Sequence, residues 1–439
     1  MRTFIDFVVV VIGVICVYFY VGVRNSPSDL KPTTPESTVA ENASSAAHAI
    51  QTPSPIKTLV KRHHILDSGL FGEKGAAIAP DGTVWVWDGD QSQAVWKSKE
   101  QRFNARQLTG IEGVVEISVG GCSIIALKDD ASVWGTGCNS SSQLGDNVKD
   151  GRGLTKDWWP IEGINNAKQI LANAKTALVL KQDGTVWAWG EDDAQLFDAD
   201  IPRVGTAAIA RVKKPVELPL QHVKEIAVMQ SDVSWSGKLL TYFALRDDGG
   251  VLGWGAQEHL RPPNISGAKD FLPINQAMFI KELAGIKSLR LNHGGQTELI
   301  LGKKDGTLML WWDLYPTCGL QNNSVFTNRF VDVRSIAKGT NEIFIVASNG
   351  SFWRTEVKWD VENKNNICMS EPEQLLPAGS AIEVASTFRS NLLLSADGKV
   401  WAWGNNLQEY NHPEFGEILE FDKRMQITGL PNMLTSASN

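Results

Sequence analysis

The 439-residue sequence has no excess of positive charge and none of the common signatures of catalysis. Its 42 Lys and Arg against 49 Asp and Glu give a formal net charge of −7. A general nucleic-acid binder needs a basic surface to neutralise phosphates, so this balance argues against that class. The sequence also lacks a Gly-x-x-x-x-Gly-Lys-Ser/Thr loop, a Gly-x-Ser-x-Gly turn and a His-Glu-x-x-His helix. We therefore expect neither enzymatic activity nor a cofactor.

The sequence offers little that would hold a metal ion. Its seven histidines are scattered, and the one adjacent pair, His63 and His64, would point to opposite faces of a strand. Two acidic segments, WDGDQSQ and EDDAQLFDAD, supply carboxylates but lack the spacing of an EF-hand. We predict no metal site. The alternative is an enzyme or metal-binding protein with carboxylates on one face of the folded body.

One long apolar run stands near the start of the chain. Residues 7–23, FVVVVIGVICVYFYVGV, carry no charge and are just long enough to cross a bilayer as a helix. No small-x-small cleavage site follows directly, so we expect an uncleaved transmembrane signal anchor over residues 1–23 rather than a removed signal peptide. Residues 24–57 are rich in Pro, Ser, Thr and Ala, which predicts a flexible stalk. The short tail before the apolar run favours a body on the periplasmic or extracellular side of the membrane.

The remaining residues, 58–439, repeat one pattern seven times at a spacing near fifty residues. Each copy has an apolar strand, a turn of the Asp-Gly type and a strand with Trp at fixed offsets, as in LVLKQDGTVWAWG. Such a turn is typical of a type I′ hairpin with two positive-φ positions. An alternating strand precedes each hairpin, and a short segment ending in Gly or Pro precedes that strand. Four short strands per period predict one blade of a β-propeller, and seven periods predict seven blades.

The turn and the rings after it define each predicted blade. The rings stand four and six residues after the turn, on one face of a strand, where stacked sheets would bury them. We interpret them as core rather than as a sugar-binding ring. Ala131 stands where the other copies have Gly, so we expect mild strain there. The blade-defining residues are Asp81, Gly82, Trp85, Asp130, Trp134, Asp183, Gly184, Trp187, Asp248, Gly249, Trp254, Asp305, Gly306, Trp311, Asn349, Gly350, Trp353, Asp397, Gly398 and Trp401.

The two ends of the repeat region suggest how the ring closes. The last short segment, MQITGLPN at 425–432, has no hairpin after it, and the first hairpin has no such segment before it. A C-terminal strand in the sheet of the N-terminal blade would leave no open edge. We predict an all-β fold: a monomeric seven-bladed β-propeller closed by pairing of its N- and C-terminal strands, preceded by one transmembrane helix and the stalk.

The repeat resembles that of the regulator of chromosome condensation family. The resemblance rests on DGTVWAWG after an apolar strand and on the Gln-Leu segments SSQLGDN and AQLFD, and it covers residues 58–439. It implies a seven-bladed propeller whose repeats are split across neighbouring blades. Members of the family include exchange factors for a small GTPase, secreted β-lactamase inhibitor proteins and binding scaffolds, so the resemblance does not fix the function.

Four cysteines outside the apolar run could form disulfides in an exported protein. Cys122 and Cys138 flank one hairpin: a three-residue turn centred on Asp130 would set them opposite each other, and a two-residue turn would not. Cys318 and Cys368 follow the Trp strands of consecutive blades and could meet between outer loops. Free buried thiols are the alternative for both pairs.

Insertions between the repeats are the places where a partner could bind. Trp158 and Trp159 lie together in DGRGLTKDWWP, and Trp235 lies in SDVSWSGKLL. Exposed aromatic residues on loops are common anchors of interfaces, although Trp158 and Trp159 could instead cover the outer edge of a blade. We predict a non-catalytic, membrane-tethered propeller whose loops bind a protein or a cell-envelope component, and no nucleic acid. Inhibition of a secreted or periplasmic hydrolase is the alternative.

Overall fold

The structure is a computed structural model, and it describes residues 66–68, 75–87, 104–120, 123–146, 148, 157–173, 175–191, 197, 211–231, 239–256, 271–272, 274–289, 299–303, 308–311, 325–326, 333–339, 342–359, 367–386, 391–404 and 421–434. The chain divides into two units, Met1–Thr58 and Leu59–Asn439, and every described residue belongs to the second. The predicted anchor and stalk therefore lie outside the described residues. Within the described ranges, no helix combines the length and the apolar character that crossing a bilayer requires.

Strand pairing among the described residues gives seven antiparallel sheets, and each sheet uses strands that are consecutive in the sequence. The first sheet contains β1 (Leu66–Ser68), β2 (Gly75–Ile78), β3 (Val84–Trp87) and β4 (Arg106–Leu108). The second contains β5 (Val114–Gly120), β6 (Ser123–Lys128), β7 (Val133–Gly137) and β8 (Trp159–Pro160). The third contains β9 (Ala167–Ala172), β10 (Thr176–Lys181), β11 (Val186–Glu191) and β12 (Arg211–Glu217).

The other four sheets follow the same plan. The fourth contains β13 (Val223–Ser231), β14 (Leu239–Arg246), β15 (Val251–Ala256), β16 (Phe271–Leu272) and β17 (Met278–Phe279). The fifth contains β18 (Ile286–Ser288), β19 (Leu299–Lys303), β20 (Leu308–Trp311) and β21 (Val325–Phe326). The sixth contains β22 (Val333–Lys338), β23 (Glu342–Ala347), β24 (Phe352–Trp359), β25 (Ile367–Met369) and β26 (Glu373–Leu376), and the last contains β27 (Ala381–Ser386), β28 (Asn391–Ser395), β29 (Val400–Trp403) and β30 (Met425–Gln426). Short 3₁₀ turns occur at η2 (Ile274–Gln276), η3 (Lys281–Leu283) and η6 (Phe421–Lys423).

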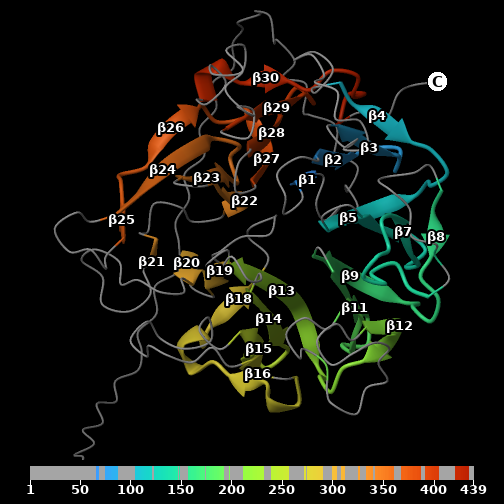
Figure 1. Ribbon diagram of the computed structural model, residues 1–439. Coiled ribbons are helices and arrows are strands. Elements are labelled where there is room, and N and C mark those ends of the chain that lie inside the picture. The colour runs from blue at the N-terminus through green and yellow to red at the C-terminus, as the bar shows by residue number, and fades with distance from the viewer. Residues whose placement is uncertain are drawn as a thin grey trace, which may run out of the picture. The chain divides into compact units, whose positions relative to one another are not determined.

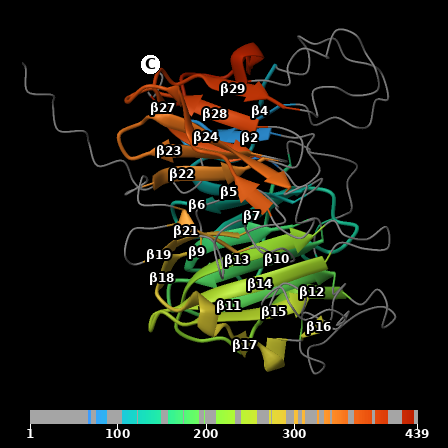
Figure 2. The same cartoon turned by 90° about the vertical axis from the view of Figure 1, so that its left-hand side faces the viewer.

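These sheets are set around a common axis, with the first strand of each sheet nearest the axis and the last strand at the rim (Figure 1). First strands of neighbouring sheets contact one another: β5 contacts β1 and β9, β9 contacts β13, and β27 contacts β22 and β1. The view from the side shows the sheets stacked along the ring (Figure 2). The Leu59–Asn439 unit is thus an all-β propeller, as the repeats predicted.

The hairpin turns differ from the predicted type I′ geometry. In the second sheet, Ala131 N donates to Lys128 O at 3.0 Å and Lys128 N donates to Ser132 O at 2.9 Å, so the loop contains three residues. Only one of these residues has a positive φ, 63° at Ala131, and Gly184 has the equivalent value of 83° in the third sheet. This is a type I turn followed by one left-handed residue. The turn Asp keeps a negative φ because its carboxylate accepts a hydrogen bond from the backbone two residues later, as in Thr185 N to Asp183 Oδ1 at 3.0 Å.

The strain expected at Ala131 gives a testable prediction. Because a left-handed conformation is costly for alanine, Ala131→Gly should raise the free energy of unfolding by about 0.5–1 kcal/mol. The control is Gly184→Ala, which should act in the opposite direction, since Gly184 has a positive φ and an added Cβ would lie 3.3 Å from His222 Cα. Denaturant unfolding measures both effects. A loss of stability in Ala131→Gly would contradict this account of the turn.

The tryptophans after each turn occupy two different environments. The tryptophans at the sixth position after the turn Asp are buried, namely Trp87, Trp189, Trp254 and Trp403. The tryptophans at the fourth position after the turn Asp or Asn are half-buried, namely Trp85, Trp134, Trp187, Trp353 and Trp401. In the third sheet Trp187 Nε1 donates to Thr185 Oγ1 at 3.2 Å, and this hydroxyl donates to Asp183 Oδ1 at 2.7 Å. The same chain of hydrogen bonds follows the turns at Asp81, Asp130 and Asn349. The half-buried ring therefore braces the turn, while the buried ring fills the core.

One predicted repeat lies partly outside the described residues. Asp305 and Gly306 are not among the residues described, and Trp311 is described only as the last residue of β20.

The predicted closure of the ring is wrong in its strand assignment. The segment 425–432 does not join the sheet of the N-terminal blade, because its strand β30 pairs with β29 in the last sheet. The short segments pair with the hairpin that precedes them rather than with the one that follows, so each sheet is complete within one stretch of chain. The ends nevertheless meet: Asn104 and Thr428 form an isolated parallel bridge, and Ala105 N donates to Thr428 O at 2.7 Å.

Candidate functional site

The two ends of the strands form two unlike faces of the propeller. The turn face carries the tight second-to-third strand turns, such as residues 79–83 between β2 and β3. The loop face carries the first-to-second and third-to-fourth connections, because successive strands are antiparallel. Third-to-fourth connections are long, with residues 88–105, 138–158 and 192–210 following β3, β7 and β11. Binding residues are commonly carried on such loops, so the loop face is the candidate site.

The start of the 138–158 connection folds onto the neighbouring third sheet. Asn139 Nδ2 donates to Gly145 O at 2.9 Å and Val148 O at 2.7 Å, and Leu144 N donates to Asn139 Oδ1 at 2.8 Å. Gln143 O then accepts a hydrogen bond of 2.8 Å from Trp189 Nε1 on β11. Residues 141–146, within the Gln-Leu segment SSQLGDN, therefore link the second sheet to the third on the loop face. We call residues 141–146 the clamp segment.

A buried carboxylate lies beside this clamp. The Glu191 side chain is only 8% exposed. Its Oε1 lies 2.7 Å from Lys175 Nζ, and its Oε2 accepts a hydrogen bond of 2.9 Å from Ser141 Oγ. Arg211 Nε lies 3.5 Å from Oε2. We call these four residues, Ser141, Lys175, Glu191 and Arg211, the Glu191 cluster.

Sequence reasoning did not single out the Glu191 cluster. The three charged residues are far apart in the sequence and come together only through strand register, in which Glu191 pairs with Arg211. The available signal was the position of Glu191, two residues after the buried Trp189 at the end of a predicted strand. Its charged partners follow from the pairing of β11 with its two neighbours.

Comparison with known proteins places this architecture among characterised propellers. No family model matches the chain. The chain is 28% identical over 241 residues to Protein pim1 of Schizosaccharomyces pombe, covering 52% of this chain and 43% of that protein. It is 24% identical over 201 residues to human E3 ubiquitin-protein ligase HERC2, covering 44% of this chain and 4% of that protein. The chain thus spans less than half the length of these curated relatives.

Solved structures share the fold. Prp20p of Saccharomyces cerevisiae, whose structure is described with its binding to Gsp1p and histones, matches with a TM-score of 0.52 at 17% identity, covering 75% of this chain and 82% of that one. The chain has the fold of an RCC1-like β-propeller, as in yeast RCC1 (Prp20). Human WBSCR16 also matches with a TM-score of 0.52 at 17% identity, covering 74% of this chain and 84% of that one. At such identities the likeness concerns the fold alone.

Two of the three predicted aromatic anchors, Trp158 and Trp159, pack against the sheets of the RCC1-like propeller. Trp158 is 7% exposed and belongs to the buried cluster shared by the first and second sheets. Trp159 is half-buried, lies opposite Gly135 in the strand pairing and packs against the cluster around the third sheet. The burial of Trp158 fits the alternative stated for it, in which this indole covers the sheets, and not the exposed anchor. Trp235 lies outside the described residues.

The burial of Trp158 predicts a structural role. Trp158→Ala should lower the free energy of unfolding by about 3 kcal/mol, because it leaves a cavity between two sheets. Chemical denaturation measures the loss. A variant that keeps its full stability but no longer binds a protein partner would restore Trp158 as an anchor.

One of the predicted disulfide cysteines is bonded. Cys138 is disulfide-bonded. The hairpin before it has the three-residue loop centred on Asp130, and Ser123 pairs with Gly137. Of the two turn lengths considered from the sequence, the three-residue turn is the one that predicts Cys122 opposite Cys138. Cys122 and Cys318 lie outside the described residues, and Cys368 lies on β25 opposite Lys358.

The turn face carries carboxylates with lowered pKa values. Hydrogen bonds from the following Ser or Thr lower the pKa of Asp130 and Asp183, and a hydrogen bond from Ser395 lowers that of Asp397. Within the described ranges, no group of three or more His, Cys, Asp or Glu side chains could hold a metal ion. These turn carboxylates act as local acceptors for the turn.

The direction of these shifts predicts a pH dependence. A lowered folded-state pKa stabilises the fold above the unfolded-state value of about 3.9, and this contribution is lost as pH falls through the folded-state pKa. Asp183→Asn should therefore lower the denaturant midpoint at pH 7, and this difference should shrink as pH falls below the unfolded-state value and through the folded-state pKa. The reverse change, Asn349→Asp, should add the same dependence, since Asn349 Oδ1 accepts the equivalent hydrogen bonds. A difference that grows on acidification would contradict the assignment.

Proposed function

We propose that this RCC1-like propeller is a non-catalytic protein that binds another protein through its loop face. The observation that carries the proposal is the contrast between the two faces. Tight, braced turns lie on one face, and interlocked sheets anchor the ends of the long third-to-fourth connections on the other. Loops on a rigid scaffold bind with little loss of conformational entropy. The binding of Gsp1p and histones by Prp20p supports a protein as the class of partner.

The proposed scaffold is one closed ring with seven blades. Its support is the set of seven sheets and the contacts between their first strands, which include β27 with β1. A single buried cluster also contains residues of the first sheet, such as Ala77, together with Leu393 and Met433 from the C-terminal part of the chain. A closed ring leaves no sheet edge at the junction of the two ends.

We further propose that the propeller is tethered to a membrane and exported. The uncharged run at 7–23 and the stalk at 24–57 support the tether. The disulfide at Cys138 supports an oxidising compartment, because such bonds persist in exported proteins and are rare in the cytosol. We propose Cys122 as its partner. Tryptic mapping without reduction should give a peptide pair that joins residues 122 and 138.

Site-specific photo-crosslinking of the full chain in its native membranes tests the binding function. A photoreactive residue replaces Lys213 on the loop face or Lys399 on the turn face. We expect a protein adduct from the Lys213 position and none from the Lys399 position. Adducts from the turn face alone, or turnover by the purified full chain in a broad hydrolase panel, would contradict the proposal. A captured hydrolase whose activity falls on binding would favour the inhibitor alternative.

A further inference from the structure

Three charged residues stand in one row across the loop-face end of the third sheet. Lys175 directly precedes β10, Glu191 ends β11 and Arg211 begins β12. The row follows the hydrogen bonds between strands: Glu191 N donates to Lys175 O at 3.0 Å, and Glu191 pairs with Arg211. The side chains therefore alternate in charge along the sheet, with the acid between two cations.

The acidic side chain of this row is buried, whereas its two basic side chains are partly exposed. The Glu191 side chain is 8% exposed, whereas those of Lys175 and Arg211 are 43% and 36% exposed. The carboxylate thus lies beneath the surface and the cations lie above it. A third cation, Lys213, is 42% exposed and lies 3.2 Å from Asp146, which is 40% exposed. Among the described residues of this row and the Lys213–Asp146 pair, the exposed groups are thus three cations and one carboxylate, on a chain whose net charge is −7.

The buried acid orients the cations in advance. Both carboxylate oxygens of Glu191 have partners, Lys175 at Oε1 and Ser141 with Arg211 at Oε2. Ser141 belongs to the clamp segment, so the second sheet helps to hold the carboxylate. Long basic side chains lose considerable rotamer freedom when they bind a partner, and this loss is smaller when they are already held.

We infer that this surface, formed by Lys175, Arg211 and Lys213, docks an acidic segment of the protein partner. This inference rests on the proposed function and adds the chemistry of the partner. The planar guanidinium of Arg211 suits a carboxylate, and Lys213 can exchange its exposed contact with Asp146 for one with the partner. A nucleic acid suits the surface less well, because three cations beside the exposed Asp146 are too few to neutralise a run of phosphates.

The sixth sheet offers a matched control with the opposite charge order. Arg354 lies between two acids there, with Nη1 3.2 Å from Glu342 Oε1 and Nη2 2.6 Å from Glu373 Oε2. Replacing Arg354 removes one cation, as replacing Arg211 does, and so changes the net charge equally. An acidic segment should not bind beside two carboxylates.

The test measures binding of a fluorescent ten-residue peptide, with Glu at alternate positions, to the full chain in detergent micelles. Fluorescence anisotropy gives the dissociation constant at low and physiological salt. We expect Arg211→Gln alone to weaken binding about fivefold and Lys175→Gln combined with Arg211→Gln to weaken it about tenfold. The matched single change Arg354→Gln should alter binding less than about twofold, and salt should weaken binding to the parent chain. Unchanged thermal unfolding and circular dichroism establish that each variant is folded.

Three results would overturn the inference. They are no binding by the parent chain, equal loss in Arg354→Gln, or tighter binding of a single-stranded oligonucleotide of equal charge that the double variant abolishes. A different outcome is that the peptide fails to bind while the photoreactive residue at position 213 still forms an adduct with a protein. In that case the proposed function stands and only the acidic partner is rejected.

Discussion

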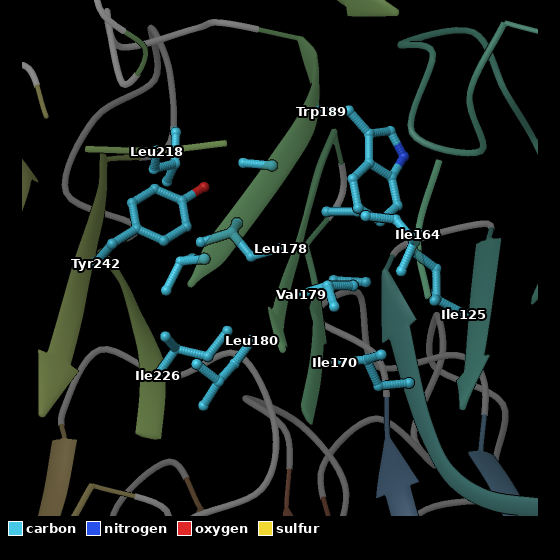
Figure 3. Close-up of a cluster of buried hydrophobic side chains, with 14 of the residues drawn as sticks. Ile125, Ile164, Ile170, Leu178, Val179, Leu180, Trp189, Leu218, Ile226 and Tyr242 are labelled. Atoms are coloured by element: carbon cyan, nitrogen blue, oxygen red, sulfur yellow. The ribbon is translucent and has the colours of Figure 1, made fainter. Parts of the chain in front are cut away.

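Trp189→Ala is expected to lower the free energy of unfolding by about 3–5 kcal/mol, as for other buried large aromatic residues. The indole is fully buried within a cluster that spans three sheets. Figure 3 shows it beside Ile125 and Ile164, with Tyr242 of the next sheet on the other side of β10 and β11. Its loss also removes the 2.8 Å hydrogen bond to Gln143 O, so the clamp segment loses its donor from the third sheet.

The neighbouring Trp187 provides the control for this prediction. It lies on the same strand two residues earlier, but it is half-buried, and its Nε1 bonds within its own hairpin to Thr185. Trp187→Ala should therefore cost about 1–2 kcal/mol, since less apolar surface is returned to water. Guanidinium unfolding compares the two variants. Equal losses of unfolding free energy would contradict the assignment of Trp189 to the core and of Trp187 to the support of the turn.

Met433→Asp is expected to destabilise the protein by at least about 3 kcal/mol, because it buries a charge without a partner at the junction of the last and first sheets. Met433 is 2% exposed, and its N donates to the turn residue Gly398 O at 3.0 Å. At other junctions the equivalent hydrogen bond comes from the first residue of the next sheet, as in Val114 N to Gly82 O and Val223 N to Gly184 O. Met433 therefore takes the position at which the inner strand of the next sheet would begin.

The matched control is Gln426→Asp, an exposed position on β30 that receives the same charge. Its effect should stay within about 0.5 kcal/mol, as for most surface changes. Equilibrium unfolding followed by tryptophan fluorescence reports on both variants. If Met433→Asp behaves like Gln426→Asp, the C-terminal residues do not contribute to the junction.

The sequence predicted local features well because each hairpin carries its own signal. Asp-Gly turns and the Trp offsets place the strands of a hairpin within a few residues, and the structure has such hairpins at Asp81, Asp130 and Asp183. The turn type was mispredicted because the Asp carboxylate caps the backbone two residues later, which favours a negative φ at Asp. Dipeptide identity alone does not report that hydrogen bond.

Longer-range relations were harder to predict. The short fourth strand could pair with the hairpin before it or after it, and a periodic sequence leaves both assignments consistent with the spacing. The predicted closure assumed pairing with the following hairpin, and so it placed segment 425–432 in the first sheet, whereas its strand β30 belongs to the last. The Glu191 cluster depends on register across three strands and on a clamp from another sheet, so no single segment encodes it. The sequence left two interpretations of Trp158 for a related reason: the aromatic pair in an insertion returns to cover neighbouring sheets, and the segment alone does not show this.

The most direct test of the closed ring is a disulfide introduced across its junction, with Asn104→Cys combined with Thr428→Cys. These residues form the parallel bridge between the first and last sheets, so their backbones are close enough for an S–S bond. We expect the bond to form within one chain under mild oxidation. Mass mapping should then find the 104–428 peptide pair, and stability should rise by about 2–4 kcal/mol because a very long loop is closed. Two thiols that stay free, or bonds that form only between chains, would contradict a ring in which the last sheet lies against the first.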